Sequence, residues 1–144
     1  MRKILACTIG NCVHVAGTMN FLNLAENEGY DTEFIGMGVS IDELLYNIKD
    51  RNPDIVALSY RLTPEPLIKI LDELKLKIKN EKLQNITWIF GGTEPTGLVA
   101  KKSGIFSKIF YGYEDIDEVI LYLKDREHSE VEEYPKDLIS RINS

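Results

Sequence analysis

One histidine and two cysteines lie close together near the amino terminus and carry the most reactive side chains of this sequence. The stretch from Cys7 to Gly17 reads Cys-Thr-Ile-Gly-Asn-Cys-Val-His-Val-Ala-Gly. A neutral imidazole ligates metals through either ring nitrogen, so His14 is the candidate ligand. Cys7 ends an apolar run, where a thiol acts as a small hydrophobic side chain. Cys12 is therefore the cysteine with possible chemistry.

Two further short motifs each follow a run of apolar residues. Ser59-Tyr60-Arg61 follows residues 54–58, and Gly91-Gly92 follows residues 86–90. A serine hydroxyl at such a place can hydrogen-bond a ligand, and glycines allow a ligand to approach the backbone closely. Gly112 follows a later apolar run in the same way.

Apolar runs alternate along the chain with patterns of helical spacing. Gly36-Met37-Gly38 is expected to close the second strand, and Ser40 with Glu43 forms a capping-box pattern that opens the second helix. The expected strands are residues 2–8, 33–36, 54–58, 86–90 and 108–111, and the expected helices are residues 17–28, 40–52, 64–79, 96–102 and 115–124.

This alternation predicts an α/β fold, a doubly wound parallel sheet of five strands in a single domain over residues 1–124. The flavodoxin-like order 2-1-3-4-5 is the simplest choice. Right-handed crossovers then bring the carboxyl ends of strands one, three, four and five to one edge, where such sheets bind ligands. His14, Ser59, Gly91, Gly92 and Gly112 all fall at that edge.

The set of motifs resembles the cobalamin-binding domains of adenosylcobalamin-dependent mutases, methionine synthase and corrinoid methyl-carrier proteins. These families carry Asp-x-His-x-x-Gly after the first strand, Ser-x-Leu after the third and Gly-Gly after the fourth. The matching residues here are His14, Gly17, Ser59, Gly91 and Gly92. The resemblance spans about residues 1–124, with motif spacings similar to those of the glutamate mutase small subunit.

The resemblance implies that cobalamin, as adenosylcobalamin or methylcobalamin, is bound base-off and His-on. His14 would ligate the cobalt in place of the cofactor's dimethylbenzimidazole, and the nucleotide tail would enter a slot between sheet and helix. Ser59 would hydrogen-bond the base or line its pocket. Gly17, Gly91 and Gly92 would make room for the tail, and Gly112 would line the same slot.

The sequence departs from the family pattern at two positions. Cys12 stands where the family has the aspartate that supports the ligating imidazole, and a thiol is only a weak acceptor. Asn11 could supply a carbonyl oxygen instead. Arg61 stands where the family has leucine, and it would lie along corrin side chains, bind a partner protein or remain a solvated charge.

Each motif also has an ordinary structural explanation. His14 alone would be a surface residue, Gly91-Gly92 alone a turn, and Ser59 a cap for the helix that follows Thr63. Cys12 is either an inert small residue or a soft ligand or redox-sensitive site. Zinc held by Cys7, Cys12 and His14 is a competing hypothesis, but structural zinc takes four ligands.

The overall composition limits the location and the partners. Net charge is −6, which repels phosphate backbones, so we expect no nucleic-acid partner and no anionic membrane surface as partner. The apolar runs are far shorter than the roughly 20 residues that span a bilayer, and no leader opens the chain, so a cytoplasmic location is expected. Residues 125–144 are rich in charge and are expected to form a solvated tail, a linker or a docking segment.

Four functions are compatible with these features. The first is the cofactor-binding subunit or domain of an adenosylcobalamin-dependent isomerase, in which a separate substrate-binding barrel covers the corrin. The chain starts directly with a strand at Arg2, whereas methyl carriers of the family place a helical bundle before this domain, so the isomerase is favoured. The second is a corrinoid methyl carrier that serves a methyltransferase. The third is a non-catalytic cobalamin sensor or storage module, and the fourth is a flavodoxin-like domain that binds no cobalamin. In the first two, the chain is not catalytic alone, because the cofactor supplies the chemistry.

Overall fold

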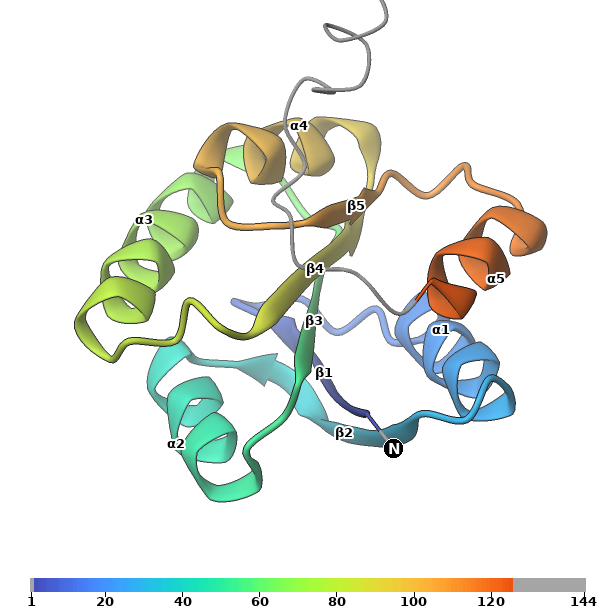
Figure 1. Ribbon diagram of the computed structural model, residues 1–144. Coiled ribbons are helices and arrows are strands. Elements are labelled where there is room, and N and C mark those ends of the chain that lie inside the picture. Colours follow the sequence, from blue (N-terminus) through green and yellow to red (C-terminus); the bar gives the residue numbers. More distant parts are fainter. Residues whose placement is uncertain (1, 126–144) are drawn as a thin grey trace, which may run out of the picture.

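The computed structural model describes residues 2–125, in which strands and helices alternate without exception (Figure 1). In chain order the elements are β1 (Lys3–Ile9), α1 (Ala16–Asn27), β2 (Asp31–Val39), α2 (Ile41–Arg51), β3 (Ile55–Tyr60), α3 (Pro64–Asn80), β4 (Thr87–Gly92), α4 (Glu94–Ser103), β5 (Lys108–Phe110) and α5 (Ile116–Lys124). The charged segment expected to follow the domain lies, from residue 126 on, outside the described residues.

The five strands form one parallel sheet in the order β2-β1-β3-β4-β5, which confirms the predicted flavodoxin-like topology. Every strand therefore ends at the same edge of the sheet. The register pairs Ser59 of β3 with Gly91 of β4, and Tyr60 with Gly92. Two motifs that are far apart in the sequence are thus direct neighbours at the carboxyl edge.

Helices cover both faces of the sheet (Figure 1). One face carries α2, α3 and α4, and its core is a large cluster of buried side chains that includes Leu58, Leu74 and Phe90. The other face carries α1 and α5 over a smaller cluster that includes Ile55, Ala57 and Ile89. Alternate residues of each strand point to opposite faces, so each strand contributes to both clusters.

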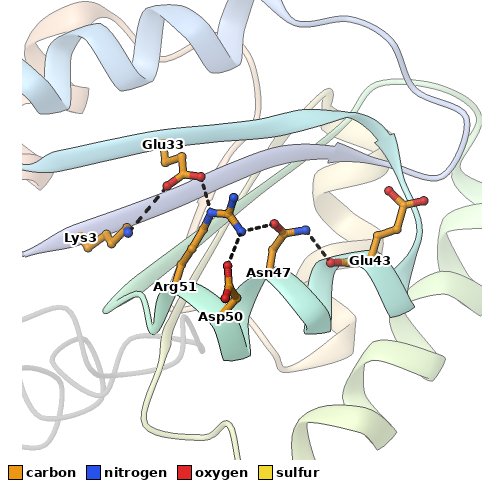
Figure 2. A network of polar contacts seen from close by, with 6 residues as sticks. All are labelled: Lys3, Glu33, Glu43, Asn47, Asp50 and Arg51. Atoms are coloured by element: carbon orange, nitrogen blue, oxygen red, sulfur yellow. Dashed lines mark hydrogen bonds and ion pairs between the residues drawn. The ribbon is translucent and has the colours of Figure 1, made fainter.

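Helix α2 begins and is fastened as its sequence suggests. The Ser40 hydroxyl accepts a hydrogen bond from the Glu43 backbone N–H at 3.2 Å. Near the other end of the helix, the Arg51 guanidinium pairs with Glu33 of β2 and donates to the Asn47 side chain (Figure 2). The contacts tie α2 to the edge strand.

Three strands, β2, β3 and β4, end at least two residues later than predicted, and each is longer than predicted. Gly36-Met37-Gly38 does not end β2, because the pairing with β1 continues to Val39 through register irregularities, with Gly36 at φ 138° and Gly38 at φ 63°. Ser59 and Tyr60 belong to β3 rather than to the loop, and Gly91 and Gly92 belong to β4. β3 and β4 have parallel partners on both sides, which keep Ser59 and the two glycines in the ladder, whereas the edge strand β2 continues through its pairing with β1 alone.

Helix α4 begins two residues earlier than expected, at Glu94, because a capping box precedes it. The Thr93 hydroxyl accepts from the Thr96 N–H, and the Thr96 hydroxyl accepts from the Thr93 N–H at 2.9 Å. Within residues 2–125, none of the helices combines the length and the apolar character needed to cross a membrane.

Candidate functional site

A cavity of about 320 Å³ opens between the sheet and the two helices α1 and α5, beside the carboxyl ends of β3, β4 and β5. We call it the α1–α5 cavity. It brings together six of the residues predicted from sequence: Gly17, Ser59, Arg61, Gly91, Gly92 and Gly112. The other lining residues are Thr18, Asn20, Phe21, Leu24, Ala57, Leu58, Ile89, Phe110, Glu114, Asp115, Ile116 and Val119.

Ser59 provides a polar group on the sheet side of the cavity. Its side chain follows Ile55 and Ala57 on the same face of β3, and the residue is only 9% exposed. Within residues 2–125 its hydroxyl has no hydrogen-bond partner, and Thr63, not Ser59, occupies the N-cap position of α3. The helix-cap explanation of Ser59 is therefore wrong, and the hydroxyl is available to a ligand.

Two of the four glycines are not required by the fold. A β-carbon placed on Gly91 would meet no atom within 4 Å, and one on Gly17 would meet only the Arg61 guanidinium, at 3.9 Å. Neither residue has a positive φ among the described backbone angles. These glycines leave open space on the cavity wall that a side chain would otherwise fill.

The other two glycines are required by packing. A β-carbon on Gly92 would lie 2.5 Å from the Tyr60 carbonyl oxygen and 2.4 Å from the Thr96 hydroxyl. Gly112 has φ 93°, and its β-carbon would lie 2.7 Å from the Gly92 carbonyl oxygen. Gly92 and Gly112 thus hold the ends of β4 and β5 together, in addition to lining the cavity.

Thr18 is a cavity residue that the sequence reasoning missed. It lies in the first turn of α1, is 7% exposed, and its hydroxyl is buried without a hydrogen-bond partner in the described part of the chain. Buried polar atoms are nearly always satisfied, so an orphaned one on a cavity wall marks a place for a ligand atom or a water. The only signal in the sequence was its place directly after Gly17.

The mouth of the cavity carries three charged residues. Both Glu114 carboxylate oxygens accept backbone N–H bonds, from Tyr111 at 2.8 Å and from Gly112 at 2.9 Å. The Asp115 carboxylate accepts from the Glu118 N–H at 2.9 Å and caps α5. Arg61 is exposed, and its guanidinium lies between Gly17 and Gly112.

His14 lies outside the cavity lining, on the loop between β1 and α1, and is exposed to solvent. Its Nδ1 atom is 3.6 Å from the sulfur of Cys12, which is fully buried. Among residues 2–125 the Nε2 atom has no partner, and Asn11, also exposed, makes no hydrogen bond to the ring. The imidazole is therefore supported by a thiol on one nitrogen and open on the other.

The loop that carries His14 is anchored beneath it. The Cys12 carbonyl accepts hydrogen bonds from the Thr8 hydroxyl and from the Gly38 N–H, and the Gly38 N–H also donates to the Thr8 hydroxyl at 2.8 Å. These bonds fasten the loop between the ends of β1 and β2. The buried Cys12 side chain belongs to the core, which fixes the start of the loop.

The zinc hypothesis finds no support in the geometry. In the part of the chain that the structure describes, no group of three His, Cys, Asp or Glu side chains gathers where it could hold a metal ion. Burial raises the pKa of the Cys7 thiol to about 12, and Glu43 adds to the effect. A thiol with that pKa stays protonated at neutral pH in the absence of a metal.

Comparison with known proteins gives one family. The model of the B12 binding domain family matches residues 2–121. A search of the curated proteins found no match.

Solved structures share the fold at low sequence identity. A cobalamin-binding protein from Desulfitobacterium hafniense DCB-2 aligns with a TM-score of 0.70 and 24% identity over 84% of this chain and 57% of its own. The methanol:cobalamin methyltransferase complex MtaBC from Methanosarcina barkeri aligns with a TM-score of 0.54 and 15% identity, over 85% of this chain and 52% of its own. This chain thus spans little more than half the length of either structure.

The same fold occurs in proteins of another kind. A response regulator receiver domain protein from Clostridium thermocellum aligns with a TM-score of 0.52 and 16% identity over 88% of this chain and 96% of its own. The topology alone therefore does not assign a ligand.

Proposed function

The chain belongs to the B12-binding domain family, so its cofactor is cobalamin, and we propose that it holds this cofactor base-off, with the nucleotide tail in the α1–α5 cavity and His14 as the lower ligand of cobalt. The observation that carries the proposal is the cavity itself. Its open wall at Gly91 and Gly17 has no explanation in the packing of the protein.

The cavity residues fit a nucleoside. Phe21, Ile89 and Phe110 offer an apolar wall to an aromatic base, while the free hydroxyls of Ser59 and Thr18 can bond to its nitrogen and to ribose. A volume of about 320 Å³ is at the small end of ligand pockets. It takes the nucleotide tail, whereas the much larger corrin must stay outside.

The His14 imidazole suits the role of a lower ligand. The Cys12 contact occupies Nδ1 and leaves Nε2 for the metal. A proton on Nδ1 that is donated to the Cys12 sulfur corresponds to the tautomer that ligates through Nε2. When bound, cobalamin supplies the organometallic chemistry, and the chain binds the cofactor and orients its metal.

Within the family, we propose the role of cofactor-binding component for an adenosylcobalamin-dependent isomerase. Motif spacings similar to those of the glutamate mutase small subunit support this role. The carboxyl edge also exposes apolar side chains on successive loops and strand ends, with Val13 60%, Met37 58% and Tyr113 71% exposed. A substrate-binding barrel that covers the corrin would bury this edge.

A corrinoid methyl carrier is the second candidate. It is favoured by the presence of a thiol, Cys12, beside the His14 imidazole. A carboxylate in place of Cys12 would raise the basicity of the imidazole, whereas a thiol leaves the ligand more weakly held. A carrier whose metal changes coordination during its cycle tolerates a weakly held ligand better than an isomerase does. The fold match to the methanol:cobalamin methyltransferase complex is in keeping with this role.

The first experiment tests binding and ligation together. Purified protein is mixed with hydroxocobalamin, desalted, and reduced to the cob(II)alamin state for electron paramagnetic resonance. We expect a retained complex whose cobalt signal carries the splitting of one imidazole nitrogen. His14→Ala should lose this splitting, while the neighbouring Asn11→Ala should keep it; a splitting that persists without His14 contradicts the assignment.

The second experiment separates the two roles. If the thiol of Cys12 supports the His14 imidazole only weakly, Cys12→Asp should raise the affinity of this imidazole for cobalt about tenfold. Because Cys12 is fully buried, urea unfolding is measured in parallel, and Cys12→Ser serves as the uncharged control. A partner captured from the native cells by the tagged chain, identified as a barrel mutase subunit or as a methyltransferase, then decides between isomerase and carrier.

A further inference from the structure

Arg61 has the features of a residue that binds an anion at the mouth of the α1–α5 cavity. Its Nη1 lies 3.9 Å from the position of a β-carbon on Gly17, and its Nη2 lies 4.0 Å from that on Gly112. The guanidinium therefore lies between the start of α1 and the end of β5. The fold does not use this charge, because within residues 2–125 Arg61 forms no ion pair or hydrogen bond.

The two carboxylates that line the cavity together with Arg61 are already engaged by backbone groups. Glu114 accepts two N–H bonds, and Asp115 caps the N-terminus of α5, where a negative charge is stabilised. Arg61 is thus the one lining charge that lacks compensation among the described residues. The planar guanidinium, with five N–H donors, binds phosphate oxygens well.

We propose, on the basis of the function proposed above, that Arg61 binds the phosphodiester of the nucleotide tail and makes the chain selective for corrinoids that carry this phosphate. The phosphodiester connects the corrin side chain to the nucleoside. When the nucleoside fills the cavity and the corrin stays outside, the connecting phosphate must pass through the mouth. A leucine, which the family pattern has at this position, could not serve this purpose.

The test compares two ligands and four proteins. Equilibrium affinities are measured by absorbance for cobalamin and for cobinamide, which lacks the phosphate and the nucleoside, with the wild type, Arg61→Leu and Arg61→Lys. Lys102→Leu, in the last turn of α4 away from the cavity, removes the same charge and serves as the control. Far-ultraviolet circular dichroism checks that each variant folds.

We expect Arg61→Leu to lower the affinity for cobalamin about tenfold or more and to change the affinity for cobinamide by less than about twofold. A hydrogen bond to a charged group contributes this much to affinity. Arg61→Lys should keep most of the affinity, and Lys102→Leu all of it. Raising the salt concentration from about 50 to about 500 mM should lower the cobalamin affinity of the wild type more than that of Arg61→Leu, because the contact that Arg61 makes is ionic.

Two results would overturn the inference while leaving the proposed function intact. Equal weakening of both ligands would place Arg61 against the corrin, and no weakening of either would make it a solvated charge. A wild-type chain that retains neither corrinoid would instead refute the proposed function, and the inference with it.

Discussion

The two faces of the sheet differ in how the size of their side chains changes along the strands. On the face under α3 and α4 the side chains of β3 stay large to the carboxyl end, with Leu58 and Tyr60. In β4 of this face Phe90 is followed by Gly92, but the Thr96 and Phe90 side chains leave no space beside that glycine. On the face under α1 and α5 they shrink in the same direction, from Ile55 through Ala57 to Ser59. β4 repeats the decrease from Ile89 to Gly91.

This difference explains why the α1–α5 cavity lies on the face under α1 and α5, beside the carboxyl ends of β3 and β4. Protein interiors pack densely, and large side chains on both partners close the gap between sheet and helix. Where the sheet side chains shrink but α1 and α5 remain at the distance set by their larger neighbours, a space is left. The stable core and the ligand site therefore share the same strands but use opposite faces.

The largest expected effect comes from filling that space. Gly91→Leu should abolish measurable cobalamin binding, a loss of a hundredfold or more, because the new side chain enters the cavity. Its stability should stay the same or rise, since a β-carbon there meets nothing and leucine is less flexible than glycine in the unfolded chain. Absorbance titration and urea unfolding measure the two quantities.

Gly92→Ala is the matched control for that variant. Its β-carbon would collide with the Tyr60 carbonyl and the Thr96 hydroxyl, so the unfolding free energy should fall. If Gly91→Leu binds cobalamin as the wild type does, the open wall has no role in binding.

The second effect should appear only in stability. Leu74 of α3 is fully buried against the opposite face, and Leu74→Ala should cost about 2–5 kcal/mol of the unfolding free energy. At temperatures where the variant remains folded, its affinity for cobalamin should match that of the wild type. A parallel loss of affinity would mean that the packing of one face affects ligand binding on the other, so that the core and the ligand site are not separate.

The sequence was sufficient for the order of the strands and for the edge where the ligand residues meet. The decrease in side-chain size from Ile55 through Ala57 to Ser59 can also be read from the sequence, since alternate residues of a strand share a face. It could not separate Gly91 from Gly92, because both read as glycines after a strand. Only the positions of Tyr60 and Thr96 show that one is required by packing and the other is not.

Thr18 shows a different limit of sequence reasoning. A threonine in the first turn of a helix is unremarkable by type, and its importance arises from burial without a partner. Whether a hydroxyl is satisfied depends on segments far away in the chain. The contact between Cys12 and His14, by contrast, was expected from the family resemblance, because Cys12 stands where the family has the aspartate that supports the ligating imidazole.

Thr18→Val should change stability and affinity in opposite directions. Valine has nearly the same shape and the same branching at the β-carbon, so the helix is preserved. Removing an unsatisfied buried hydroxyl should raise the unfolding free energy by about 1 kcal/mol, whereas the loss of one ligand hydrogen bond should weaken cobalamin binding about two- to tenfold. A variant that gains stability and keeps full affinity would show that the hydroxyl does not contact the ligand.

The smallest effect belongs to the polar network between α2 and the edge strand (Figure 2). Glu33→Gln removes the charge that pairs with Arg51 and with Lys3, the latter at 3.7 Å, and all three side chains are partly exposed. Partly exposed pairs are screened by water, so the loss should be about 0.2–1 kcal/mol and should shrink at high salt. Cobalamin affinity should not change, because none of the three residues lines the α1–α5 cavity. A change in affinity with this variant would mean that β2 and α2, as well as the helices beside the cavity, help to set its shape.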